Sequence, residues 1–135
     1  MNLFAKHIEY KRSDLHNRYG GNRQSGISSS KNHPIIMLFS SAAGEEYGYQ
    51  DSWYSDKEFH YAGEGQHGDM EFVRGNKAIR DHVMNDKELH LFTRIRKAYV
   101  RYEGKFEYDG HHIEQRSDNS SQLRNMIVFH LRLLE

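Results

Sequence analysis

Short apolar stretches, separated by turn residues, most constrain what this chain can fold into. The clearest of them is a period-two stripe near the carboxyl terminus, made of Ile127, Phe129, Leu131 and Leu133. Period-two spacing places alternate side chains on one face of an extended strand. The residues Asn119, Ser120 and Ser121 precede this stripe and are typical of a turn. The pattern therefore predicts a last strand that buries one face.

Four further segments have the same character. Pro34 leads into a continuous apolar run over 35–40, which is suited to a buried strand. Alternating segments follow over 57–62, 88–94 and 98–108. The polar segment 22–33 and the glycine-rich segment 63–68 are expected to be loops.

Two short helices are expected. Ser13 or Asp14 is suited to cap the first, which Gly20 and Gly21 would end. Asn76 is suited to cap the second, which would run through Asp81 to Met84. Strands joined mainly by turns favour a small curled sheet or barrel over a parallel α/β fold.

At 135 residues the chain is expected to form one domain. We expect an α+β fold in which residues 1–34 form a helix and a loop and residues 35–135 form a twisted β-barrel. The amino terminus has no signal-peptide core, and no apolar run reaches membrane-spanning length. A soluble, cytoplasmic protein is expected.

The chain contains no cysteine and ten histidines. Disulfides, thiolate zinc sites and cysteine nucleophiles are therefore excluded. His111 with His112, and His60 with His67, are the histidine pairs that a metal could use. Neither pair has a helical spacing or an evident carboxylate partner, so scattered surface histidines are the favoured interpretation. No metal and no cofactor are expected.

Charge is balanced but unevenly distributed. The chain has 19 basic and 19 acidic residues. The net charge is +4 over 1–34, −6 over 35–75 and +2 over 76–135. Such a chain could hold phosphates at the rim of an acidic pocket, although an ordinary mixed surface explains the pattern equally well. If nucleic acid is the partner, modest affinity with a shallow salt dependence is expected.

The segment from Gly48 to Met70 carries the candidate site. Tyr49 and Tyr61 could sandwich a flat polar ring, and Asp51 could accept a hydrogen bond from its amine. Glycines in the following turn (Gly63, Gly65 and Gly68) would let backbone amides approach the ring's other edge. Each residue also has a structural interpretation, since tyrosines pack in cores, aspartates cap turns and glycines serve turn geometry.

Six motifs occur in a characteristic order. They are YGGNRQSGI (19–27), GYQDSW (48–53), FHYAGEG (59–65), RGNKAI (74–79), LHLFTR (89–94) and RYEGKFEY (101–108). In this order they resemble SRA domains, the modified-cytosine readers also called YDG domains. The version here is similar to that of bacterial McrA-type, modification-dependent restriction endonucleases with an HNH nuclease domain.

The resemblance implies a PUA-like β-barrel that flips a modified cytosine, carrying a 5-methyl or 5-hydroxymethyl group, out of duplex DNA. Tyr49 and Tyr61 would stack on the flipped base, and Asp51 would accept from the cytosine amine. Main-chain groups near Ala62 and Gly63 would complete the edge. Contacts to the DNA backbone or groove are expected from five residues: Arg23, Gln24, Arg74, Asn76 and Lys77.

Two features depart from the family pattern. Only ten positions separate Gly65 from Gly75, so the finger that pushes the base out in eukaryotic SRA domains is absent or replaced. Arg23, Gln24 and Arg74 are candidates to fill the gap. Glu103 also stands where the name-giving motif has aspartate.

Two other function classes stay open. Glu103 and Lys105 have the E-x-K spacing of some magnesium-dependent nucleases, with Asp81 or Asp86 as a partner acid. A PUA-like RNA binder or small-molecule sensor would use a similar barrel. We expect a non-enzymatic reader of double-stranded DNA, linked to an HNH nuclease domain and able to form a homodimer.

Overall fold

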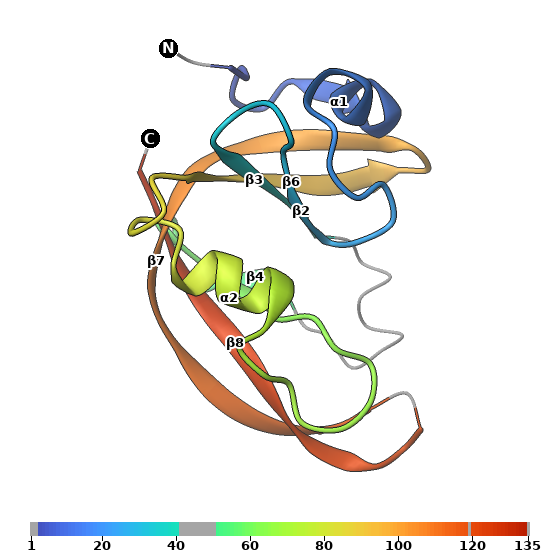
Figure 1. Cartoon of the computed structure of the whole chain (residues 1–135), viewed down its shortest axis with the longest axis vertical. Coiled ribbons are helices and arrows are strands. Elements are labelled where there is room, and N and C mark those ends of the chain that lie inside the picture. Colours follow the sequence, from blue (N-terminus) through green and yellow to red (C-terminus); the bar gives the residue numbers. More distant parts are fainter. Residues whose placement is uncertain (1–2, 41–50, 119, 135) are drawn as a thin grey trace.

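The computed structural model describes residues 3–40, 51–118 and 120–134. Within these ranges strands dominate and two short helices are present (Figure 1). The elements follow in the order β1 (Glu9–Lys11), α1 (Arg12–Tyr19), β2 (Ile27–Ser29), β3 (Ile35–Ser40), β4 (Ser52–Trp53), β5 (Glu58–Ala62), α2 (Arg74–Arg80), β6 (Glu88–Arg96), β7 (Tyr99–Ser117) and β8 (Leu123–Leu133).

The described strands form a single sheet in the order β2-β3-β6-β7-β8-β5-β4, with β1 paired to β7. All pairings are antiparallel except that of β3 with β6. The two end strands, β2 and β4, are not paired with each other in the described part of the chain. The predicted α+β fold with a twisted barrel is confirmed in the form of a barrel-like sheet that does not close.

Strand β3 is covered on both faces, and this accounts for its almost entirely apolar sequence. All six of its residues are buried. Alternate side chains enter two separate cores on opposite faces, Ile36 and Leu38 in one and Ile35, Met37 and Phe39 in the other. A strand covered on both faces favours apolar side chains, and the one polar residue of β3, Ser40, lies at its end and is hydrogen-bonded to Asp51.

The two cores are covered by different parts of the chain. Helix α2 contributes Ile79 to the larger core, which also contains Phe106 and Phe129. The amino-terminal segment and α1 cover the smaller core with Phe4, Leu15 and Tyr19. In Figure 1, α1 lies at one end of the molecule and α2 lies over the body of the sheet.

The hairpin of β7 and β8 extends along most of the length of the molecule (Figure 1). Two register shifts bend β7, one beside Gly104 and one between Tyr108 and His111. Gly104 and Gly110 have φ angles of 131° and 122°, a region that side-chain-bearing residues rarely adopt. Bulges of this kind increase twist, and here they curl the sheet.

Three details of the sequence-based fold were wrong. The segment expected to be a loop over 22–33 contains β2, and β1 also lies in the amino-terminal 34 residues, so this part of the chain contributes two strands to the sheet. Helix α1 begins after Lys11, without a side-chain cap from Ser13 or Asp14. Helix α2 begins after Val73 and ends at Arg80, so Asn76 lies inside it.

The helix end at Gly20 and the buried strands over 35–40 and 57–62 agree with the prediction. The backbone N–H of Gly20 donates to the carbonyl oxygen of His16, with a φ of 74° at Gly20. None of the helices in the described ranges is long and apolar enough to cross a membrane.

Candidate functional site

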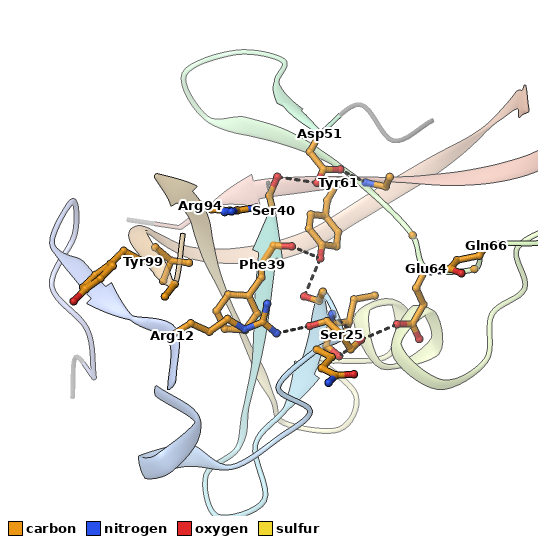
Figure 2. A pocket seen from close by; sticks show the side chains of 18 residues that line it. Arg12, Ser25, Phe39, Ser40, Asp51, Tyr61, Glu64, Gln66, Arg94 and Tyr99 are labelled. Carbon is orange, nitrogen blue, oxygen red and sulfur yellow. Dashed lines mark hydrogen bonds between the residues drawn. The ribbon is translucent and has the colours of Figure 1, made fainter. Parts of the chain in front are cut away.

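A pocket of about 530 Å³ opens between the end of β3, the start of the glycine-rich turn after β5, and the turn that joins β6 to β7. Figure 2 shows its lining side chains. Eighteen residues line it: Arg12, Gln24, Ser25, Gly26, Ile27, Phe39, Ser40, Asp51, Tyr61, Ala62, Gly63, Glu64, Gly65, Gln66, Arg94, Ala98, Tyr99 and Val100. A volume in this range is typical of sites for small organic groups.

Asp51 holds a fixed position at one end of the pocket (Figure 2). One carboxylate oxygen accepts a hydrogen bond from the Ser40 hydroxyl at 2.7 Å, and the other accepts from the backbone N–H of Ala62 at 2.7 Å. Burial raises the pKa of Asp51 to about 6, although both hydrogen bonds act in the opposite direction. Each oxygen has a second lone pair, so the carboxylate can accept further hydrogen bonds from a ligand.

Tyr61 on β5 forms part of the pocket wall. Its hydroxyl also connects β5 with the loop before β2 and with β3. The hydroxyl lies 2.9 Å from the carbonyl oxygen of Gly26 and 3.0 Å from that of Phe39, and the two oxygens share its single O–H donor. The side chain is buried, with 3% of its surface exposed. The predicted pocket residues Ala62 and Gly63 follow Tyr61 directly and also line the cavity. Tyr49, the second predicted stacking residue, lies outside the described residues.

Asn76 fixes the glycine-rich turn rather than facing outward. Its Oδ1 accepts from the backbone N–H of Glu64 at 2.8 Å, and its Nδ2 donates to the carbonyl oxygens of Glu64 and Glu71, each at 2.9 Å. Only 1% of Asn76 is exposed. Asn76 thus lies buried and bonded to the backbone, and not on the outer face of α2 where a contact to DNA was expected.

Gly63 in this turn and Gly75 in the first turn of α2 are required by close packing around Asn76 and Glu64. A Cβ atom at Gly63 would lie 2.8 Å from Oδ1 of Asn76, and one at Gly75 would lie 2.7 Å from Oε2 of Glu64. The Glu64 carboxylate accepts from the backbone N–H of Gly75 at 2.9 Å and from the Ser25 hydroxyl at 3.2 Å. The turn is thus held against both α2 and the loop before β2.

The other predicted DNA contacts differ in their position. Gln24 lines the pocket and is exposed. Arg23 is also exposed, and its guanidinium donates to Oδ1 of Asn17 at 2.6 Å. Arg74 and Lys77 are exposed on α2 but do not line the pocket. Gly65 lines the cavity as expected, whereas Gly68 does not.

Arg12, Arg94 and Tyr99 are among the pocket residues that sequence reasoning missed. The guanidinium of Arg12 lies 3.8 Å from the centre of the Phe39 ring and donates to the carbonyl oxygen of Ser25 at 2.6 Å. Arg94 and Tyr99 flank the turn between β6 and β7 and line the same cavity. The run RIRKAY over 94–99 combines basic and aromatic residues, and this composition was the available signal.

The E-x-K motif has a structural role in this fold. Glu103 is 3% exposed, and its carboxylate accepts from the Thr93 hydroxyl at 2.6 Å and from Nε of Arg101 at 2.8 Å. Lys105 is paired with Glu88 at 3.5 Å. Among the described residues, the acidic and histidine side chains close enough to share a metal do not include Glu103.

The sequence and the fold both have recognised relatives. The family model described as ScoMcrA-like, SRA domain matches residues 6–135. No curated protein sequence matches the chain. The fold is similar to that of the type IV phosphorothioation-dependent restriction endonuclease ScoMcrA, with a TM-score of 0.76 and 20% identity over 96% of this chain and 28% of that one.

Two other solved structures are similar. The sulfur-binding domain and SRA domain of ScoMcrA, complexed with phosphorothioated DNA, give a TM-score of 0.76 and 18% identity over 96% of this chain and 39% of that one. The SRA domain of SUVH5 in complex with hemimethylated CG DNA gives 0.70 and 21% identity over 99% and 91% of the two chains. The chain thus spans well under half of the ScoMcrA chains that it matches. From the match over residues 6–135, the chain belongs to the ScoMcrA-like SRA domain family.

Proposed function

We propose that this chain binds duplex DNA that contains a modified cytosine, 5-methylcytosine or 5-hydroxymethylcytosine, and takes the flipped base into the pocket around Asp51. The observation that carries the proposal is the position of the Asp51 carboxylate. It lies at the pocket wall, oriented by Ser40 and Ala62, with lone pairs left for a ligand. A carboxylate is the natural acceptor for the exocyclic amine of cytosine.

The remaining walls suit a flat, polar ring. Tyr61 and the backbone of Ala62 and Gly63 line the cavity next to Asp51. In the proposed complex the ring of Tyr61 packs against the base and Tyr49 covers its other face. Stacking contributes about 1–3 kcal/mol per base, which offsets the few kcal/mol needed to unstack it.

Relatives of the same fold support this class of ligand. The SUVH5 SRA domain was solved with hemimethylated, fully methylated and fully hydroxymethylated CG DNA. ScoMcrA, whose SRA domain was solved together with a separate sulfur-binding domain and phosphorothioated DNA, provides the alternative that the modification lies in the backbone. A pocket that ends in a carboxylate favours a base over an anionic phosphorothioate, because two negative charges in a partly buried site repel each other.

Basic side chains around the pocket would hold the duplex. Arg12, Gln24 and Arg94 line the cavity, and the exposed Arg23 directly precedes Gln24. Arg74 and Lys77 on α2 remain proposed contacts to more distant phosphates. The gap that the flipped base leaves in the duplex would be filled by Arg23, Gln24 or Arg74.

The role of the domain follows from this proposal. The chain would act as the reader that directs a restriction nuclease, such as a fused HNH domain, to modified DNA. It would perform no catalysis itself, and two copies would be able to act together as a homodimer. The nuclease alternative loses its main support because Glu103 is buried in an ion pair with Arg101.

Competition binding tests the proposal. Labelled duplex with one 5-methylcytosine is bound to the chain and competed with otherwise identical duplexes that carry cytosine, 5-hydroxymethylcytosine or a phosphorothioate linkage, and with single-stranded RNA. We expect modified-cytosine duplexes to compete at least several-fold better than the others. Equal competition by all duplexes, or preference for the phosphorothioate or for RNA, would contradict the proposed function.

Matched variants connect the selectivity to the pocket. Asp51→Ala removes the proposed hydrogen bond to the base, which costs about 1.5–3 kcal/mol, or roughly tenfold to a hundredfold in affinity. Asp56→Ala removes an exposed carboxylate from the same segment and serves as the control. Selectivity lost equally in both variants would show that the effect is only one of net charge.

A further inference from the structure

Three neighbouring strands carry a cluster of histidines and glutamates on the face of the sheet opposite Tyr61. We call Glu58 and His60 on β5, His130 on β8, and His112 and Glu114 on β7 the histidine cluster. His60 and His130 are direct cross-strand partners in the pairing of β5 with β8. His60 precedes Tyr61 on β5, so the two side chains point to opposite faces. The cluster therefore lies outside the proposed base pocket.

The side chains of the cluster are in direct contact. The rings of His60 and His130 stack with their centres 4.3 Å apart, and Nδ1 of His112 lies 2.6 Å from Nε2 of His130. At its two ends, a Glu58 oxygen lies 2.6 Å from Nε2 of His60, and a Glu114 oxygen lies 2.9 Å from Nε2 of His112. The pair Glu58 and His60 and the pair His112 and Glu114 thus lie on either side of His130.

The hydrogen bonds define which nitrogens are available. Nε2 of His112 faces Glu114, so Nδ1 is the ring nitrogen of His112 that faces His130. Neutral imidazole is the form that binds metals.

We propose that the histidine cluster binds one divalent transition-metal ion of the Zn²⁺ class. Glu58, His60 and His130 each offer a ligand atom, and these atoms lie within 4.8 Å of one another. In a tetrahedral zinc site with bonds of about 2.0–2.1 Å, the ligand atoms are roughly 3.3 Å apart, so small side-chain rotations suffice. His112, whose Nδ1 lies 2.6 Å from Nε2 of His130, becomes the fourth ligand once the two rings move apart.

Several features distinguish this cluster from scattered surface histidines. All four proposed ligands lie on strands of one sheet, whose backbone positions are fixed by pairing with neighbours. Glu114 bonded to His112 provides the carboxylate partner that metal-bound histidines usually have. The side chains of Glu58 and His60 are 28% and 16% exposed, which leaves an entry path from solvent. Imidazole and carboxylate ligands without thiolates suit Zn²⁺, Co²⁺ or Ni²⁺.

Such an ion would connect β5, β8 and β7 directly behind Tyr61. An ion that binds only to the folded state increases the free energy of unfolding. The increase grows with the logarithm of the ratio of the metal concentration to the dissociation constant. The ion would therefore act as a structural brace for the strand that carries the base pocket.

Metal titration of the full chain, free of any polyhistidine tag and stripped with a chelator, tests this inference. We expect calorimetry with ZnCl₂ to show one ion per chain, and CoCl₂ to give the visible absorption of tetrahedral Co²⁺. Zinc should also raise the midpoint of thermal unfolding. The inference is overturned if zinc binding does not saturate. It is also overturned if the ligand variants described below bind zinc as well as the unmodified chain does.

The variants separate the cluster from other histidines. His130→Ala should weaken zinc binding by at least about 100-fold, and Glu114→Gln, which removes an outer partner, by roughly 10–100-fold. His60→Gln serves as a second ligand variant in case His130→Ala unfolds. His67→Ala removes an exposed histidine bonded to Ser120 and should leave zinc affinity unchanged. Equal affinity in His130→Ala, His60→Gln and His67→Ala would overturn the site.

Discussion

Asp51 lies in an environment unlike that of a surface aspartate. The carboxylate is buried between Ser40 and Ala62, and burial raises its pKa to about 6. An acid whose pKa is higher in the folded protein than in the unfolded chain makes folding less favourable as pH rises through the interval between the two values. Here that interval runs from about pH 4 to about pH 6.

Replacing Asp51 with asparagine removes this pH dependence. Asparagine keeps an acceptor for Ala62 and a group that can bond to Ser40, but it does not ionise. We expect the free energy of unfolding of Asp51→Asn, relative to that of the unmodified chain, to increase between pH 4 and pH 7 by about 2–3 kcal/mol. Denaturant unfolding at several pH values measures this difference. A difference that stays constant over the range would show that Asp51 titrates normally.

Tyr61 shows why one residue can serve both the fold and the site. Its ring lines the pocket, and its hydroxyl bonds to carbonyl groups of the loop before β2 and of β3. Truncating a buried aromatic side chain costs about 3–5 kcal/mol, so Tyr61→Ala would confuse binding with unfolding. Tyr61→Phe retains the stacking face and is the cleaner test of the hydroxyl.

Among the elements, strands with buried apolar side chains could be predicted from the sequence. The short polar strand β2 and the starts of the two helices could not. Strand β3 was evident because two cores require a continuous apolar run, and β8 was evident from its stripe. Strand β2 was missed because its sequence, ISS, is short and polar and is held by pairing with β3. The helix starts were missed because neither Lys11 nor Val73 caps with its side chain.

The same distinction applies to the site. Asp51, Tyr61, Ala62 and Gly63 are close in sequence and could be predicted together. Arg12 on α1 and Arg94 on β6 come from distant segments, and only the tertiary fold brings them to the pocket. The position of Asn76 was not predicted, because a side-chain amide can cap a helix at the surface or bond to buried backbone groups equally well.

Helix α2 offers a paired prediction from adjacent residues. Asn76→Ala removes three hydrogen bonds to backbone groups of the glycine-rich turn and should destabilise the fold by about 2–4 kcal/mol. Lys77→Ala changes an exposed side chain and should alter the free energy of unfolding by less than about 0.5 kcal/mol. Thermal and denaturant unfolding measure both. Equal stability of the two variants would contradict the role assigned to Asn76.

For the whole molecule, a net charge of zero limits the electrostatic part of DNA binding. Basic residues at the pocket, such as Arg12 and Arg94, are balanced by acidic residues nearby, including Asp51 and Glu64. Recognition is then expected to depend mainly on the pocket rather than on the charge of the phosphates.

The salt dependence of binding measures this balance. With two to four phosphate contacts, the slope of log affinity against log salt concentration should be roughly −2 to −4, since each contact contributes about −0.9. Fluorescence anisotropy with modified duplex between low and moderate salt gives the slope. A slope much steeper than about −6 would indicate binding dominated by phosphates, and the proposed pocket would then contribute little.

Fluorescence of 2-aminopurine placed next to the modified cytosine tests the central proposal most directly, because its emission rises when the neighbouring base leaves the stack. We predict a marked increase when the chain binds duplex with 5-methylcytosine, a much smaller one with unmodified cytosine, and loss of the difference in Asp51→Ala at saturating protein. Saturable binding to the modified duplex without any change in fluorescence would contradict base flipping into the Asp51 pocket.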